Sequence, residues 1–370
     1  MTGIYVHIPF CAAKCNYCDF NSYAGLFEYR GSYINALCRE IAVSEHICNA
    51  DVDTVYFGGG TPTVCRPDEL GRVLDAVKSR ANLTADCEIT LECNPGTSDY
   101  NSFKALRGLG FNRLSIGLQS ADDKMLKTLG RIHSFSDFKT CFADARRAGF
   151  DNISVDLIYG LPNQNIDDWK NTLEETVRFK PQHISCYALK IEQGTPFADM
   201  KLDLPDDDSV GDMYDYSVDF LGGIGYNRYE ISNFAQNGYQ SRHNLKYWNC
   251  DDFLGFGAGA YSCTANKRYS NIKSVVDYCA KDGVNCVDRG TEVLLTAADK
   301  MSEFCFLGLR LESGISESEF ENRFNCKITD VFGDVIDKNI SRGTLERKDG
   351  RIKIPDKWLF VSNGILVDFV

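Results

Sequence analysis

The chain has 370 residues, of which 44% are hydrophobic and 25% are charged, and its formal net charge is −12. This length accommodates one large domain and a smaller one, with an ordinary globular composition. The negative charge argues against nucleic acid or an anionic membrane as the main partner. No apolar run reaches the roughly 18 to 20 residues of a membrane span. The start, MTGIYVHIPF, lacks the basic region of a secretory signal.

The first two thirds of the chain alternates strand-like and helix-like segments. Six short apolar, β-rich runs occur at residues 4–10, 52–59, 87–94, 113–120, 153–160 and 183–191. The amphipathic segments between them often end at glycine, as in GLGF and RAGF, which is typical of helix C-caps. Six βα units predict a parallel sheet with outer helices. Since a complete barrel needs eight units, we expect an α/β fold with a partial (β/α)6 TIM-like barrel over residues 1–235.

Two further patterns follow the predicted barrel. Residues 236–290 are rich in aromatic residues, asparagine and glycine, and are expected to form a connecting segment. Residues 291–370 predict two or three helices and then a hairpin over 345–369 with an Asp349-Gly350 turn, which together form a small winged-helix-like α+β domain. A DNA-binding wing is the obvious alternative. The region has 11 Lys and Arg against 14 Asp and Glu, so it lacks the basic surface that DNA binding needs.

Each strand-like run ends in a polar or glycine-rich stretch. Because the carboxyl ends of parallel strands share one face of a barrel, we expect a functional site there. In chain order the six ends are a cysteine loop, the glycine-rich loop 58–62, Glu92, Gln119, Asp156 followed by Gly160, and Tyr187.

The chain contains 16 cysteines, three of which are clustered. Most of the others occur singly in apolar segments such as HISCYALKI, where cysteine acts as a small hydrophobic residue, and we expect a reducing, cytoplasmic location. Cys11, Cys15 and Cys18 follow the first strand with the spacing C-x3-C-x2-C. A structural zinc site would need a second cysteine pair downstream. We expect instead a [4Fe–4S] cluster held by three thiolates, with one iron left open.

This spacing, in the first βα loop of a partial barrel, resembles that of the radical S-adenosyl-L-methionine (SAM) superfamily. The resemblance implies that the open iron binds the amino and carboxylate groups of SAM. The glycine-rich loop 58–62 exposes backbone groups at close range. Glu92 and Asp156 supply carboxylates, while Gln119 and Arg131 supply donors for oxygen atoms of the ligand. Taken singly, each of these residues fits a structural role equally well.

The segments YVHIPFC, GGGTP, SIGLQS and DLIYGLP narrow the resemblance to the oxygen-independent coproporphyrinogen III oxidase branch, over nearly the whole chain. That branch implies which residues contact SAM. They are Tyr5, Gly59, Gly60, Thr61, Glu92, Gln119, Arg131, Asp156 and the backbone of Ala188.

Two families of this branch, the oxidases and the heme chaperones of the HemW type, differ at one position after the cysteines. The oxidases carry a further cysteine two residues past the third, where this chain has Phe20 in CDF, the form of the chaperones. The chaperones also carry a signature H-N-x-x-Y-W, which is intact here as HNLKYW at residues 243–248. The resemblance therefore favours the chaperones.

The residue types of the HNLKYW signature also suit heme binding on chemical grounds. A histidine can ligate heme iron, and the rings of Tyr247 and Trp248 can stack on a porphyrin. A lone histidine beside aromatic residues is more often a packed or hydrogen-bonded residue, but the intact signature makes His243 the heme-ligand candidate, with Cys250 as the alternative.

Three functions are compatible with these features. The first is a heme chaperone with a cluster and SAM, which delivers heme to respiratory proteins. The second is an enzyme, the SAM-dependent oxidative decarboxylation of coproporphyrinogen III to protoporphyrinogen IX, and the third is radical modification of heme itself. Turnover stays open, so no catalytic residue is assigned. The resemblance further implies an electron donor, peripheral contact with a membrane and a homodimer.

Overall fold

Six parallel strands lie side by side in their order along the chain, in a computed structural model that describes residues 1–370. All five neighbouring pairs are parallel. This confirms the predicted α/β fold with a partial barrel. The strands are β1 (Thr2–Ile8), β4 (Asp51–Gly59), β5 (Asn82–Cys93), β6 (Arg113–Gln119), β7 (Asn152–Tyr159) and β8 (His183–Ala188).

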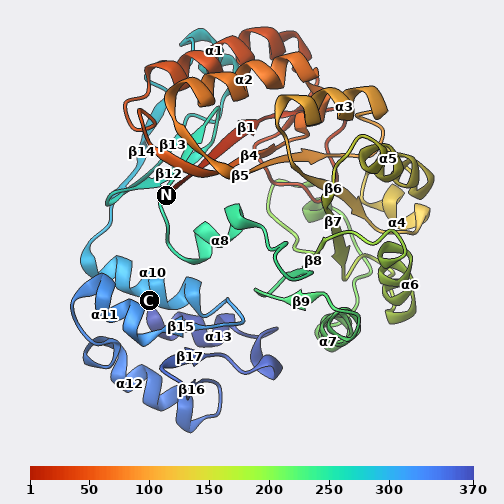
Figure 1. The fold of residues 1–370 in the computed structure, drawn as a ribbon. Helices are drawn as coiled ribbons and strands as arrows, with labels where there is room; N and C mark the ends of the chain where they lie inside the picture. Colours follow the sequence, from red (N-terminus) through yellow and green to blue (C-terminus); the bar gives the residue numbers. More distant parts are fainter.

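Helices cover the outer side of these strands (Figure 1). Their apolar faces pack on the sheet, and side chains cap several of their first turns, as Asp99, Ser134 and Asn165 do. This arrangement leaves the inner side of the curved sheet for the loops and the site. The helices are α1 (Arg30–Val43), α2 (Pro67–Arg80), α3 (Tyr100–Leu109), α4 (Asp123–Thr128), α5 (Phe135–Arg147) and α6 (Ile166–Val177).

Additional strands extend both edges, which gives a sheet of 12 strands. At one edge β11 (Phe253–Phe256) pairs in parallel with β1, and three antiparallel strands continue from it. At the other edge two short antiparallel strands follow β8. Much of the segment expected to be a connector is thus part of the sheet. The added strands are β12 (Tyr261–Thr264), β13 (Lys267–Asn271), β14 (Val287–Leu294), β10 (Asn233–Ala235) and β9 (Asn227–Arg228).

Three further helices belong to the middle of the chain. The helix α8 lies on the inner side of the curved sheet, toward the C-terminal part of the chain (Figure 1). It contains the whole HNLKYW signature. The helices are α7 (Asp207–Gly223), α8 (Arg242–Trp248) and α9 (Val275–Ala280).

The C-terminal part consists of helices and a small antiparallel sheet. The predicted turn joins β16 (Glu346–Lys348) to β17 (Arg351–Lys353), with positive φ angles at Asp349 and Gly350. The expected second half of the hairpin is wrong after residue 353, because residues 356–369 form short helical turns. Leu359, Ile365 and Phe369 of these turns are buried. The remaining elements are α10 (Ala297–Gly308), β15 (Ile315–Ser316), α11 (Glu317–Phe324), α12 (Ile328–Ser341) and α13 (Asn363–Leu366).

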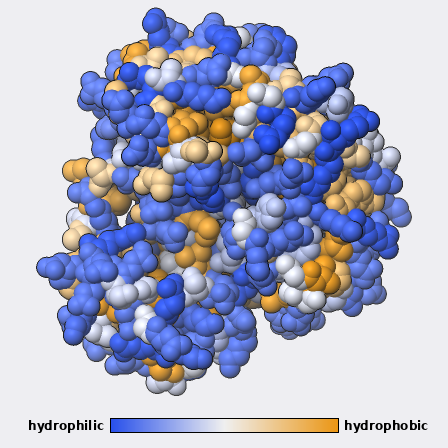
Figure 2. Space-filling view, viewed as in Figure 1, coloured by the Kyte–Doolittle hydropathy of each residue, from blue (hydrophilic) through white to orange (hydrophobic).

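One hydrophobic core runs through both parts, from Val6 and Leu114 in the barrel strands to Phe304 and Phe320 in the C-terminal helices. On the face drawn in Figure 2, hydrophilic residues predominate and the hydrophobic ones form separate patches. None of the helices combines the length and the apolar character that a membrane span requires.

Candidate metal centre and cofactor site

The three clustered cysteines line one cavity of about 370 Å³ at the carboxyl ends of the barrel strands. Cys11 is buried, and Cys15 and Cys18 are half-buried. The Thr61 hydroxyl donates to the Cys11 sulfur at 3.6 Å, and Arg131 Nη1 donates to the Cys15 sulfur at 3.6 Å. Donors of this kind stabilise thiolates, the form of cysteine that binds metal.

The donor set fits an iron–sulfur cluster better than a single ion. No three His, Cys, Asp and Glu side chains of the chain converge on the position of one metal ion. In a cubane cluster each thiolate binds a different iron, so its three sulfurs surround a larger volume. Three thiols around one cavity match that requirement, and the predicted spacing of the cysteines is consistent with it.

The glycine-rich loop brings its backbone against the same cavity. Gly59 has φ +112°, and a Cβ there would lie 2.4 Å from the ring of His7. A Cβ on Gly60 would lie 2.6 Å from the Phe10 carbonyl oxygen. Both positions therefore need glycine, and the loop offers its peptide groups to a ligand at close range.

Glu92, at the end of β5, is a half-buried carboxylate beside this loop. Its Oε1 accepts a hydrogen bond of 2.9 Å from the Tyr56 hydroxyl, and its Oε2 accepts one of 3.0 Å from the Gly59 amide. Burial raises the pKa of Glu92 to about 7, and the nearby Asp156 carboxyl also raises it. A cationic group in the cavity would favour the ionised form.

Asp156, on β7, is a second half-buried carboxylate. Its oxygens accept hydrogen bonds from Ser185 at 2.7 Å and from Ser115 at 2.8 Å. Burial raises the pKa of Asp156 in spite of these donors. The two carboxylates thus give the cavity acceptors suited to ammonium or hydroxyl groups.

A hydrogen-bonded chain joins β6 to the cysteine loop. Arg131 Nη2 donates to the carbonyl of Gly117 at 2.7 Å and to the side-chain oxygen of Asn94 at 2.5 Å, and the Asn94 amide donates to Thr61 at 2.7 Å. Gln119 has φ +72°, where the register between β6 and β7 shifts. Such a bulge redirects a side chain next to a site.

The structure brings together most of the residues predicted to contact SAM. Tyr5 is the exception: it does not line the cavity, and its hydroxyl is 3.0 Å from His7 Nδ1. The predicted residues that do line it are Gly59, Gly60, Thr61, Glu92, Gln119, Arg131, Asp156 and Ala188.

Sequence reasoning missed several residues of the site, among them Asn94 and Arg113. Asn94 directly follows the β5 strand, a position that could have identified it. Arg113 lines the cavity, is 2% exposed, and its Nε has no hydrogen-bond partner. An arginine at the start of the strand-like run RLSIGLQS was the available signal, since a buried cation needs a partner.

The HNLKYW signature is held inside the molecule. The His243 side chain is 1% exposed, its Nδ1 is 2.9 Å from the Thr54 hydroxyl, and its Nε2 is 2.8 Å from the Tyr247 hydroxyl. Burial, and then the charge of Lys246, lower the pKa of His243 to about 3, so the ring is neutral. Both ring nitrogens are thus engaged, and heme ligation by His243 stays a prediction.

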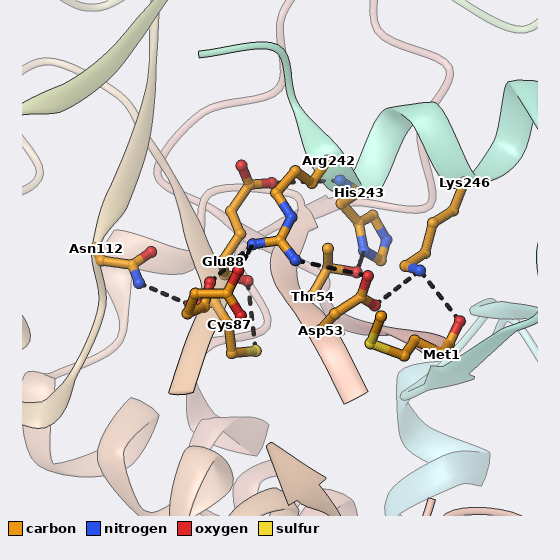
Figure 3. A network of polar contacts seen from close by, with 10 residues as sticks. Met1, Asp53, Thr54, Cys87, Glu88, Asn112, Arg242, His243 and Lys246 are labelled. Carbon is orange, nitrogen blue, oxygen red and sulfur yellow. Dashed lines mark hydrogen bonds and ion pairs between the residues drawn. The ribbon is translucent and has the colours of Figure 1, made fainter. Parts of the chain in front are cut away.

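Ion pairs fix α8 to the amino ends of β4 and β5 (Figure 3). Lys246 Nζ is 2.7 Å from Asp53 Oδ1 and donates to the Met1 carbonyl at 3.1 Å. Arg242 pairs with Asp86 at 3.2 Å. Trp248, at the end of the helix, has a buried Nε1 without a partner. The helix therefore closes the barrel at the end opposite to the cysteine loop.

Comparison with known proteins shows which family the chain belongs to. Residues 5–176 match the radical SAM superfamily, and residues 295–360 match the HemN C-terminal domain. The chain is 35% identical to the heme chaperone HemW of Lactococcus lactis, over 99% of this chain and 96% of that protein, and 39% identical to the heme chaperone HemW of Escherichia coli, over 98% and 95%. The chain belongs to the HemW family.

A solved structure agrees with the fold. Coproporphyrinogen III oxidase (HemN) from Escherichia coli, described as a radical SAM enzyme, superposes with a TM-score of 0.87 at 23% identity, over all of this chain and 89% of that one. As a member of the HemW family within the radical SAM superfamily, the chain has the [4Fe–4S] cluster and SAM as its cofactors. The cavity described above has the thiols, glycines and carboxylates that fit both.

Proposed function

We propose that this chain is a heme chaperone, which binds heme and transfers it to heme-dependent respiratory proteins. The observation that carries this is its similarity to HemW chaperones over nearly their whole length. The likeness to the oxidase is a likeness of fold, since its identity is 23%. Fold alone does not transfer an activity.

Phe20 supports the chaperone over the oxidase. Its side chain is 66% exposed and lines the cavity that the three cysteines share. By the resemblance, oxidases have a cysteine at this position. A phenyl ring supplies neither a thiolate nor a hydrogen-bond donor, so the chemistry of that extra thiol is missing here.

Cys11, Cys15 and Cys18 would hold the cluster. When bound, the cluster supplies one-electron chemistry at an iron that no protein side chain ligates. Thr61 and Arg131 donate hydrogen bonds to two of the sulfurs and so stabilise their negative charge.

The remaining residues of the cavity would orient SAM. Glu92 and Asp156 present carboxylate oxygens that suit the N–H donors of its amino group and its ribose hydroxyl groups. Gln119 lines the cavity from β6 and supplies an amide donor. The positive sulfonium of SAM would offset part of the negative charge of these two carboxylates when the site is filled.

The partners are part of the proposal. A donor of electrons would serve the cluster, and the acceptors of heme would be respiratory proteins, at which peripheral contact with a membrane is expected. The negative charge of the chain argues for acceptors with basic surfaces rather than for binding to anionic lipid. A homodimer is proposed as well, from the resemblance.

The experiment reconstitutes the cluster anaerobically and follows two reactions in parallel. Hemin titration should give a stable one-to-one complex, and the complex should release heme to an apo-cytochrome b. Incubation of the same preparation with coproporphyrinogen III, SAM and a reductant should release no CO₂. CO₂ release together with vinyl formation, without heme transfer, would establish the oxidase instead.

A further inference from the structure

A second cavity, of about 480 Å³, lies between the end of α8, the antiparallel strands β12 and β13, and the C-terminal helices α10 and α11. Its size is within the range of cavities that bind organic cofactors. Aromatic and aliphatic side chains form much of its wall. They include Tyr247, Phe253, Met301, Leu307 and Phe324.

The helix α8 separates this cavity from the cluster cavity. Asn244 lines the cluster cavity, and Tyr247, one turn later, lines the second cavity. The Tyr247 hydroxyl bonds to the buried His243 ring at 2.8 Å, while its own ring packs edge-on against Phe253, with centroids 4.7 Å apart. The HNLKYW signature thus forms a wall shared by two cavities, and its histidine lines neither of them.

A free thiol lies where α8 ends. Cys250 lines the second cavity, and its backbone is left-handed, with φ +54°. Its amide bonds to the Tyr247 carbonyl, and the next amide bonds to the Lys246 carbonyl at 2.9 Å, which closes the helix. Glycine is usual at this position of a helix end, so the turn itself does not call for a cysteine.

Cationic groups lie around the same cavity. Arg268, Lys300 and Arg323 line it, and Arg268 pairs with Glu303 at 2.9 Å while Arg323 pairs with Glu319 at 3.3 Å. Lys300 has no carboxylate partner and donates to the carbonyl of Ala265. A ligand with an apolar plane and terminal carboxylates would find both of its parts matched.

We propose that heme binds in this second cavity, with the Cys250 sulfur on the iron and the propionates toward Lys300 and Arg268. The inference rests on the proposed heme-chaperone function and adds a location and a ligand to it. Thiolates are established axial ligands of heme iron. As the Fe–S bond forms, the thiol proton leaves to solvent and the iron keeps its oxidation state. The buried His243 ring then holds the wall in place through Tyr247.

The test titrates hemin into the full-length chain and records absorption and electron paramagnetic resonance spectra, and then the carbon monoxide complex after reduction. The wild type should show the signature of a thiolate ligand. Cys250→Ala should lose that signature and bind at least tenfold more weakly. The matched control, Cys48→Ala, removes an exposed thiol that is distant from Cys250 in the sequence. It should change neither the thiolate signature nor the affinity for heme.

A second pair of variants tests the location independently of the ligand. Leu307→Trp fills the cavity and should reduce the amount of heme bound, whereas Ala298→Trp, at an exposed position of the same helix, should not. Circular dichroism and the cluster absorbance show that each variant is folded.

The outcomes separate the two proposals. If the wild type binds no heme, the proposed function fails, and this site fails with it. If the wild type binds heme and Cys250→Ala and Leu307→Trp leave affinity and spectra unchanged, the site is overturned while the function stands. If His243→Ala removes the axial ligand and Cys250→Ala does not, heme binds at the signature histidine and the inference is likewise overturned.

Discussion

The hydroxyl of Tyr56 on β4 donates a hydrogen bond of 2.9 Å to the carboxylate of Glu92 on the neighbouring strand β5. The contact favours the ionised form of a carboxyl group whose pKa burial nevertheless raises to about 7. Asp156 also raises this pKa, and Arg113 lowers it. The charge of Glu92 therefore changes within the neutral range.

The first prediction concerns the pH dependence of SAM binding. Since an ionised Glu92 would accept a hydrogen bond from the SAM amino group and attract the positive sulfonium, affinity should rise by up to about tenfold per pH unit below pH 7 and level off above it. Equilibrium binding of SAM to the reconstituted protein, measured from about pH 5.5 to about pH 8.5, tests this pH dependence, because that range lies on both sides of the pKa of Glu92. Glu92→Gln should bind weakly without that slope. Parallel pH profiles of the two proteins would contradict the role of Glu92.

The raised pKa of Glu92 also makes the free energy of unfolding depend on pH. The folded carboxyl binds its proton more tightly than the unfolded one, whose pKa is near 4.5. Its stabilising contribution is therefore full below pH 4.5 and is lost as the pH rises through about 7, by roughly 3 kcal/mol at most. Urea unfolding of the protein without cofactors should show a smaller loss over this window for Glu92→Gln.

The second prediction concerns the cluster. Cys15→Ser should abolish the brown absorbance after anaerobic reconstitution, because two thiolates and a serine do not hold the cluster in this cavity. Iron and sulfide analysis measures the loss. Cys48→Ser, which changes an exposed thiol, is the control and should retain the full absorbance. Unchanged absorbance in Cys15→Ser would overturn the ligand assignment.

The third prediction concerns the ion pair that anchors α8. Lys246→Met leaves Asp53 buried with only Arg242, 3.7 Å away, and should lower the free energy of unfolding by about 3 kcal/mol. The double variant with Asp53→Asn should recover part of the loss, because no buried charge remains unpaired. Urea unfolding measures both.

The control for that experiment is an exposed pair. Arg39 and Asp282 are 2.7 Å apart, with side chains 58% and 54% exposed, so Arg39→Met should cost less than about 1 kcal/mol. Equal losses for Lys246→Met and Arg39→Met would show that burial does not govern the α8 anchor.

The fourth prediction concerns Gly59. An alanine there combines the strain of φ +112° with a Cβ 2.4 Å from the His7 ring. Gly149→Ala is the matched control, since φ is +94° and nothing lies within 4 Å of its Cβ. Gly59→Ala should destabilise by about 1–3 kcal/mol more than the control and should lose SAM binding. Equal effects would mean that the His7 contact relaxes freely.

The barrel was predictable because its strands follow a simple rule. Parallel strands buried on both faces form continuous apolar runs, and their polar ends meet at one site. The added strand β11 was missed because Phe253–Phe256 is short and lies in the glycine-rich run FLGFGAGAYS, which has the composition of a loop.

The parts of the site that sequence could not predict depend on tertiary contacts. Nothing in HNLKYW indicates that His243 meets Thr54, which lies 189 residues earlier in the chain. Tyr5 belongs to the predicted SAM set by resemblance, but it does not line the cluster cavity, and its hydroxyl is 3.0 Å from His7 Nδ1. Local patterns identify which residues carry chemistry, and packing decides where they face.

The position of α8 between two cavities has an energetic consequence. A ligand that shifts this helix in one cavity changes the shape of the other, so the two affinities are linked. Linkage is reciprocal: whatever factor SAM imposes on the affinity at the far side of α8, a ligand bound there imposes on SAM. In such an arrangement SAM acts as an effector of loading and release, even where it is never consumed.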